Sequence, residues 1–169
     1  MYGPEYRERL EGQKEENLLM VNNFLRVARV VQEDPDHIIA YEWPAYCRGW
    51  DNPTVIKMIQ ELQLREVRLD GCQVGVKTKD GQPILKPWKI MTNSQRLIEA
   101  LRGKICPKDH VHHPCAGQYT EQTGFYPRKM ARIIIKAFAE EIGDQVSRDA
   151  RNIRGHERRR GSFPKAIQK

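Results

Sequence analysis

The stretch Cys106-Pro-Lys-Asp-His110-Val-His112-His113-Pro-Cys115 gathers two of the four cysteines and three of the five histidines of the chain. Thiolate and imidazole groups are the ligands that zinc prefers in proteins. Such a concentration within ten residues is rare by chance and predicts a metal-binding loop. A metal held here would fix the loop on the domain that carries it.

The ligands of this predicted site need not all come from the loop. Adjacent residues such as His112 and His113 rarely reach one ion together, and Pro114 stiffens the chain before Cys115. A cysteine at the end of a predicted strand would relieve that strain. The preferred ligands are Cys72, Cys106, His110 and His112, with Cys115 as the substitute. Four protein ligands predict a closed, structural zinc site, and the competing interpretation is a loop without metal.

Length and composition indicate one soluble globular domain. The chain has 169 residues, of which 39% are hydrophobic and 30% charged. No apolar stretch approaches the roughly 18 residues that span a bilayer. Residues 1–9 contain no apolar secretory region. We therefore expect an intracellular, reducing compartment and no membrane partner, with an organelle as the alternative if a presequence has been removed.

Hydrophobic periodicity and turn residues predict alternating helices and strands. Helices are expected at 16–33, from Pro53, at 95–101 and from about Pro127. Strands are expected at 37–43, 65–69 and 86–91, with a hairpin turn at Asp80-Gly81. The order helix, strand, helix, strand predicts partly parallel pairing. The expected fold is a small, three-layer-like α/β domain with a short mixed sheet of three or four strands.

The domain limits follow from composition. Residues 1–15 are polar and predict an irregular or loosely helical N-terminal extension. Residues 16–143 would form the α/β domain, with the zinc-type loop at 104–117. Residues 144–169 would form a basic tail.

Positive charge is concentrated at the end of the chain. Residues 148–169 contain eight Lys/Arg and two Asp/Glu, a net charge of +6 out of +7. This asymmetry predicts a partner that is a polyanion such as nucleic acid, and the alternative is a solvated tail that only aids solubility. Aromatic residues Trp43, Tyr46, Trp50 and Trp88, interleaved with cations, could stack on bases or form ordinary core. The residues predicted to contact nucleic acid are Arg48, Lys86, Lys89, Arg151, Arg154, Arg158, Arg159, Arg160 and Lys165.

Catalytic signatures are sparse. The sequence has no recognisable Ser/His/Asp arrangement and no Gly-rich phosphate loop, and Cys47 has no obvious activating partner. Glu42 ends a predicted buried strand, where carboxylates can serve an active site. The simpler interpretation is a structural pair between Glu42 and an arginine such as Arg48. These observations favour a non-catalytic protein.

Three motifs carry a family resemblance: residues 40–44 (AYEWP), 71–75 (GCQVG) and 86–93 (KPWKIMTN). Their order resembles the C-terminal part of the catalytic fold in divergent, phage-type cytosine-5 DNA methyltransferases, and related polyprotein segments of protist retroelements. The likeness covers about residues 16–140 and continues through the Cys/His cluster, Thr123 to Pro127 and the final helix. It implies that Glu42 would grip a target cytosine, with Gly75 and Lys86 to Lys89 near the substrate.

The departures from that family concern its chemistry. The family binds S-adenosylmethionine through a Gly-rich loop and attacks the base with a Pro-Cys cysteine. Neither feature precedes Glu42 in this sequence. The resemblance therefore implies a fragment, a partner half that needs a second chain for the cofactor, or a scaffold without catalysis.

Three functions follow from the sequence. The first is a non-catalytic, zinc-stabilised module that associates with RNA or DNA, for example as a subunit of a ribonucleoprotein assembly. The second is the methyltransferase half described above. The third is a protein–protein adaptor whose tail binds an acidic partner.

Overall fold

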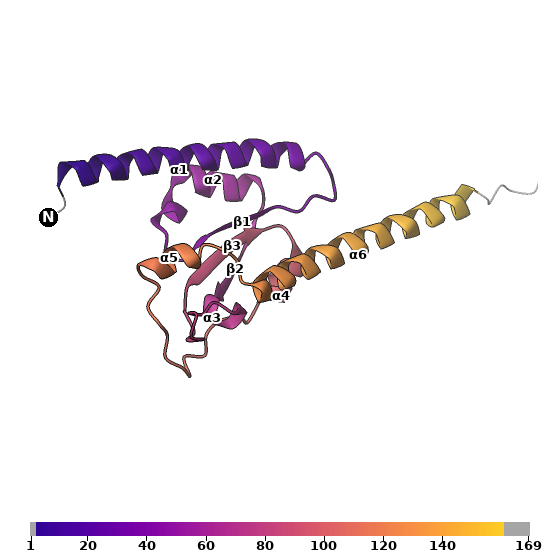
Figure 1. Cartoon of the computed structure of the whole chain (residues 1–169). Coiled ribbons are helices and arrows are strands. Elements are labelled where there is room, and N and C mark those ends of the chain that lie inside the picture. The colour runs from indigo at the N-terminus through magenta and orange to yellow at the C-terminus, as the bar shows by residue number, and fades with distance from the viewer. Residues whose placement is uncertain (1–2, 161–169) are drawn as a thin grey trace, which may run out of the picture.

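The computed structural model describes the backbone of residues 3–160 and the side chains of residues 3–146. The elements in chain order are α1 (Pro4–Val31), β1 (Ala40–Pro44), the 3-10 turn η1 (Arg48–Asp51), α2 (Pro53–Glu61), β2 (Arg65–Asp70), α3 (Gly71–Val74), β3 (Pro87–Thr92), α4 (Gln95–Leu101), α5 (Gln118–Gln122) and α6 (Arg128–Arg160). Three strands form one sheet in the order β1-β3-β2. Helices α1 and α2 lie on one face of the sheet, and α3, α4 and α6 lie on the other (Figure 1). The predicted three-layer α/β domain is confirmed.

The predicted mixed sheet is wrong, because β3 runs antiparallel to both of its neighbours. Strands β1 and β2 point the same way and are joined through α2, as the alternating pattern indicated. They do not pair, however, because β3 lies between them and hydrogen bonds to both. The predicted turn at Asp80-Gly81 is present, but its flanks form only an isolated antiparallel bridge between Lys77 and Pro83.

Two hydrophobic clusters hold the layers together, one on each face of the sheet. Strand β3 serves both clusters because successive side chains of a strand point to opposite faces. Trp88 and Ile90 pack with α4 and α6, whereas Met91 packs with α1 and α2. On the second face, Tyr41 and Trp43 join the cluster through edge-to-face ring contacts with Trp50.

Side-chain caps define the starts of two helices. Asn52 Oδ1 accepts a hydrogen bond of 2.9 Å from the Thr54 N–H, and Pro53 occupies the first position of α2. Ser94 Oγ accepts a hydrogen bond of 3.0 Å from the Leu97 N–H and begins α4. Because these side chains satisfy backbone amides that lack helical partners, both helices begin where the sequence predicted.

Two long helices differ from the prediction. Helix α1 begins at Pro4, so residues 4–15, predicted as an irregular or loosely helical extension, are part of one helix with the residues that follow. Helix α6 continues past Gly143 to Arg160, so no helix end marks the predicted start of the tail. Residues 4–15 are rich in Glu and Arg and residues 144–160 in Arg, and these residues favour helix without contributing an apolar face. The periodicity of apolar residues therefore understated their length.

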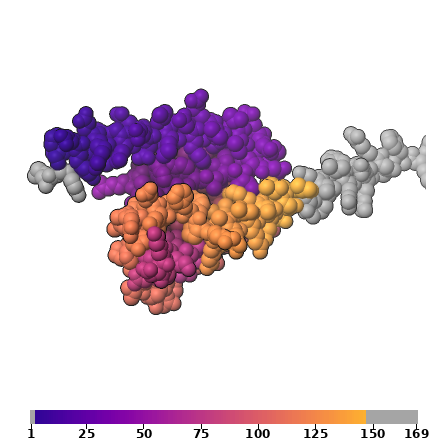
Figure 2. All heavy atoms as spheres, viewed as in Figure 1, coloured from indigo at the N-terminus to yellow at the C-terminus, as the bar shows by residue number. Residues whose placement is uncertain are grey.

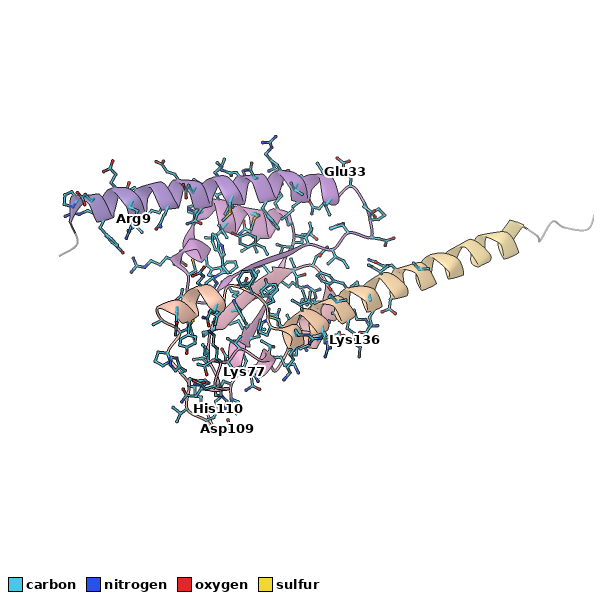
Figure 3. All side chains as sticks on the ribbon, in the orientation of Figure 1. Arg9, Glu33, Lys77, Asp109, His110 and Lys136 are labelled. Carbon is cyan, nitrogen blue, oxygen red and sulfur yellow. The ribbon has the colours of Figure 1, made fainter. Side chains whose placement is uncertain are left out.

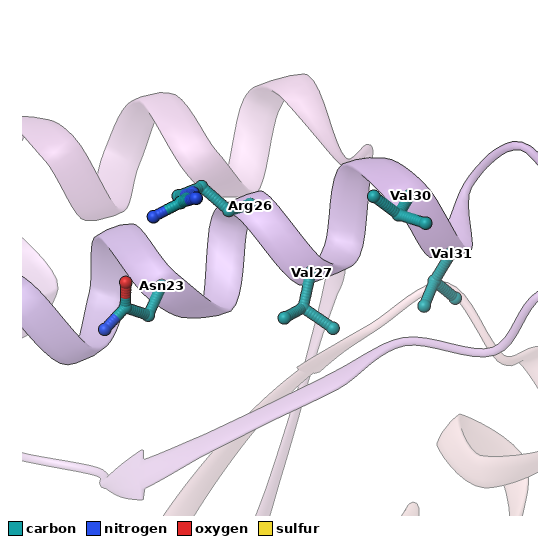
Figure 4. A pocket seen from close by; sticks show the side chains of 5 residues that line it. All are labelled: Asn23, Arg26, Val27, Val30 and Val31. Atoms are coloured by element: carbon teal, nitrogen blue, oxygen red, sulfur yellow. The ribbon is translucent and has the colours of Figure 1, made fainter.

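Part of the apolar surface of helix α1 is not covered by the rest of the domain. Figure 2 shows α1 spread along one side of the molecule, opposite the lobe that contains the Cys/His loop. Its Val27 and Val30 side chains are 63% and 65% exposed. A shallow groove of about 530 Å³ on this surface is lined by Asn23, Arg26, Val27, Val30 and Val31 (Figure 4).

No helix within residues 3–160 combines the length and the apolar character that crossing a bilayer requires.

Helix α2 offers a matched test of the packing. Met58 is fully buried, whereas Ile56, two residues earlier, is 43% exposed. Met58→Ala should lower the free energy of unfolding by about 2–5 kcal/mol, because it leaves a cavity among well-packed neighbours. Ile56→Ala should cost less than about 1 kcal/mol. Urea denaturation measures both values, and equal costs would contradict this packing of α2.

Candidate metal centre

Four side chains from two distant segments converge at one end of the domain: Cys72, Cys106, His110 and His112. Their ligand atoms all lie within 4.8 Å of one another. Cys106 Sγ lies 3.7 Å from His110 Nε2 and 3.4 Å from His112 Nε2. This arrangement could hold a metal ion, and it brings together the preferred ligand set of the sequence analysis.

The substitute ligand Cys115 lies outside the cluster. Its side chain is exposed, and its Sγ lies 3.4 Å from Thr123 Oγ1. His113 is also turned away, because its N–H donates to the Pro83 carbonyl and its Nδ1 lies 2.9 Å from the Pro114 carbonyl. The expectation that adjacent histidines would not both reach the site agrees with this geometry.

Cys72 is positioned by the short helix α3, directly after β2. The Gly71 N–H points to the carbonyl oxygens of Leu85 and Lys86, which holds the start of α3 against the chain that leads into β3. A Cβ atom at Gly71 would lie 2.8 Å from Val76 Cγ2, so a larger residue here would require Val76 to move. Gly75 ends the helix with φ +99°. The backbone is therefore fixed both before and after Cys72.

Cys106 is positioned by Asp70, the last residue of β2. Asp70 Oδ2 accepts a hydrogen bond of 2.8 Å from the Cys106 N–H, and the Asp70 N–H donates to the Lys104 carbonyl at 2.8 Å. After Cys106 the chain turns through Lys108, whose φ is +61°. The Lys108 N–H donates to Cys106 Sγ at 3.3 Å, which fixes the position of the sulfur atom.

His110 is oriented by its neighbour Asp109. His110 Nδ1 lies 2.6 Å from Asp109 Oδ1, so Nδ1 carries the proton and Nε2 presents its lone pair to the cluster. Figure 3 shows both residues at the end of the domain far from α1. The sequence analysis missed the roles of Asp109 and Asp70. A carboxylate next to a histidine was the available signal for Asp109, whereas Asp70 carried none.

Burial raises the pKa of the Cys72 thiol, and the hydrogen bond with Cys106 raises it further. Two neighbouring sulfur atoms cannot both ionise easily without a compensating positive charge. A bound cation would supply that charge, and its binding would release protons from the thiols.

Two lysines predicted to contact nucleic acid already have partners inside the fold. Lys86 Nζ donates to the carbonyl oxygen and to Oγ1 of Thr123. Lys89 Nζ lies 4.1 Å from the ring centroid of Trp50 and 3.5 Å from Glu66 Oε2. Its side chain is only 13% exposed. Lys86 and Lys89 therefore both contribute to packing between elements.

The aromatic residues divide into core and surface. Trp50 and Trp88 are buried, and Trp43 is half-buried against Trp50, so these rings belong to the core. Tyr46 is 82% exposed, and Arg48, two residues later in the chain, is also exposed. Among the described side chains predicted to meet nucleic acid, Tyr46 and Arg48 are therefore the most accessible.

The basic tail falls at the limit of what the structure describes. Arg151, Arg154, Arg158, Arg159 and Arg160 belong to α6, but their side chains lie outside the described residues. Lys165 lies outside the described residues altogether.

Glu42 pairs with a tyrosine and not with Arg48. Tyr126 Oη donates a hydrogen bond of 3.1 Å to Glu42 Oε2. Burial raises the pKa of Glu42 above its ordinary value, and this effect exceeds the opposing influences of Tyr126 and Lys86. Tyr126 in turn contacts Trp88 edge-on, with the ring centroids 6.1 Å apart. Glu42 thus fastens the edge strand β1 to the segment before α6.

No protein-family model matches the chain, and no curated protein or solved structure matches it significantly. The resemblance to cytosine-5 methyltransferases and retroelement segments therefore stays a prediction from short motifs.

The raised pKa of Glu42 leads to a pH-dependent prediction. Because folding disfavours the ionised carboxyl, the wild type should lose stability as pH rises from the ordinary glutamate pKa through the raised folded value. Glu42→Gln keeps an acceptor for Tyr126 but cannot ionise. We expect this variant to be at least as stable as the wild type at pH 8, with the difference shrinking towards pH 4.

Urea denaturation of both proteins across this range measures the effect. Because other titrating groups are common to the two proteins, only the difference between them reports on Glu42. A variant that is less stable at pH 8, by a margin that persists on acidification, would contradict the prediction.

Proposed function

We propose that this chain is a non-catalytic module in which a structural zinc ion holds the Cys/His loop, and that the module associates with nucleic acid. The convergence of Cys72, Cys106, His110 and His112 carries the proposal. The charge of the C-terminal segment supports the choice of partner.

The spacing of the cluster suits zinc. Zinc bonds of about 2.3 Å to sulfur and about 2.0–2.1 Å to nitrogen, at tetrahedral angles, separate sulfur from nitrogen by about 3.6 Å. The distances from Cys106 Sγ to His110 Nε2 and His112 Nε2 are 3.7 and 3.4 Å. The set contains sulfur and nitrogen donors only, which disfavours magnesium and calcium.

The donor set also argues for a structural role. Two cysteines and two histidines complete a tetrahedral sphere, so no position would be left for a substrate or a reactive water. The ion would instead tie the chain after α4 to α3. The domain has two hydrophobic clusters of its own, and we therefore expect the metal to stabilise this end and not to be required for folding as a whole.

Charge supports a polyanionic partner. Residues 148–169 hold eight of the 29 basic residues and two of the 22 acidic ones, so the rest of the chain is nearly neutral. Arginines recur in the sequence at positions 148, 151, 154 and 158. In helices, steps of three and four residues gather like charges along one side. Arginine is also the residue best suited to binding phosphate groups.

Metal analysis tests the first half of the proposal. Purified protein should contain about one zinc ion per chain. Chelation should lower the melting temperature by about 4–8 °C, as a loss of about 2 kcal/mol would for a chain of this size.

Cys72→Ser and Cys106→Ser should lose the ion, whereas Cys115→Ser should keep it. A protein without stoichiometric metal, or retention of zinc by Cys72→Ser and its loss from Cys115→Ser, would refute this ligand set.

Deletion of residues 148–169 tests the second half. Binding to a labelled oligonucleotide should weaken, and the dependence of log K on log salt should flatten by roughly 0.7–0.9 for each phosphate contact removed. In the full chain, replacing Arg151, Arg154 and Arg158 by Gln should reproduce part of the loss, whereas Lys at the same positions should retain most of the affinity. Fluorescence anisotropy between 50 and 300 mM salt provides the measurement.

Unchanged affinity of the deleted protein at every salt concentration would remove this role from the segment. If the natively purified chain keeps its partner after nuclease treatment, the adaptor function would replace nucleic-acid binding.

A further inference from the structure

A groove of about 750 Å³ lies beside the metal cluster. The turn after β1, the chain that enters β3 and the end of the Cys/His loop form its walls. Its lining includes Pro44, Tyr46, Leu85, Lys86, Pro87, His112 and Pro114. The volume is within the range of small-molecule sites, which is roughly 300–1,000 Å³.

The lining combines flat apolar surfaces with positive charge. Three prolines and a leucine supply apolar walls, and none of the lining residues is Asp or Glu. Tyr46 is 82% exposed, so its ring contributes little to the core. Arg48, two residues later, is exposed and belongs to the adjoining turn η1. An exposed aromatic ring with nearby cations is the arrangement that binds unpaired bases and their phosphates.

Lys86 is held in place within this groove. Its backbone has φ +28°, a conformation that residues other than glycine rarely adopt. The Gly71 N–H points to the Lys86 carbonyl oxygen at 3.0 Å and helps to maintain it. Two protons of the ammonium group go to Thr123, which leaves a third for another acceptor. Residues that the surrounding structure holds in rarely populated backbone conformations are concentrated at binding sites.

One residue of the Cys/His cluster also lines the groove. His112 belongs to both, with Nε2 directed to Cys106 Sγ at 3.4 Å. The following residue, His113, is anchored through its N–H to the Pro83 carbonyl at 2.8 Å and packs on Tyr119. An ion bound at the cluster would therefore immobilise the loop that closes one side of the groove.

We infer that this groove binds an unpaired nucleotide of a single-stranded nucleic acid, with the base stacked on Tyr46 and a phosphate at Lys86 and Arg48. The inference rests on the proposed function and deepens it. The C-terminal arginines would attract both single strands and duplexes through their phosphates. The groove would add a preference for single strands, since a paired base cannot leave its stack without cost.

Binding of the full, zinc-loaded chain to labelled 12-nucleotide uridine and thymidine oligomers, and to a 12-base-pair duplex, tests the inference. Tyr46→Ala should weaken single-strand binding about 5- to 150-fold and leave duplex binding unchanged. Tyr46→Phe should bind like the wild type, because stacking needs the ring and not the hydroxyl. Phe125→Ala is the matched control: Phe125 is 79% exposed but does not line the groove, so its loss should change neither affinity.

The outcomes separate this inference from the proposed function. If the wild type binds single strands and Tyr46→Ala does so equally well, or if Phe125→Ala has the same effect as Tyr46→Ala, the groove is not the site and the proposed function stands. If Tyr46→Ala weakens duplex binding as much, the preference for single strands is refuted.

If the wild type binds neither single-stranded oligomer nor duplex at 50 mM salt, both proposals fail. Tyrosine fluorescence that responds to a proline-rich decapeptide in the wild type and not in Tyr46→Phe, without any response to the oligomers, would assign the groove to a protein partner and overturn the inference. Equal melting temperatures and zinc contents of the variants would exclude misfolding as the cause.

Discussion

The carboxylate of Asp70 forms the hydrogen bond on which the Cys/His end of this molecule depends. It accepts a hydrogen bond from the backbone of Cys106, 36 residues away in the chain, while its own N–H binds Lys104. These bonds bring the segment after α4 to the end of β2, where α3 begins with Gly71. Without them Cys72 and Cys106 would have no reason to meet. The position of the Cys/His cluster therefore follows from the hydrogen bonds made by the last residue of β2.

The groove depends on the same junction. Gly71 approaches the chain at Leu85 and Lys86, and that approach sets the unusual backbone of Lys86. The lysine then reaches Thr123 in front of α6, so residues from three separate segments form the walls around Tyr46. The Cys/His cluster and the groove are thus built from the same segments. We therefore expect a metal ion bound at the cluster to restrain the loop that lines the groove.

Hydrogen bonds and packing explain which sequence predictions hold. Caps act over three or four residues, so Asn52 and Ser94 define the starts of α2 and α4 without help from the rest of the chain. Long-range pairs left no such signal. Tyr126 binds Glu42 across 84 residues, where the sequence suggested the nearby Arg48. Likewise, nothing in residues 86–91 indicated that β3 would separate β1 from β2, and the mixed sheet followed from that omission.

The amino-acid sequence by itself indicated most of the local elements, the concentration of positive charge at the C-terminal end and the four Cys/His side chains that converge. Steric reasoning about adjacent histidines and Pro114 favoured this set over Cys115, because these constraints act within a few bonds. Tertiary structure alone decided the antiparallel sheet, the orientation of His110 by Asp109 and the groove beside Tyr46. Sheet order and groove walls arise from segments far apart in the chain, whose meeting depends on packing across the whole domain. The contact between Asp109 and His110 is local. Its role becomes evident only once the position of Cys106 relative to His110 is known.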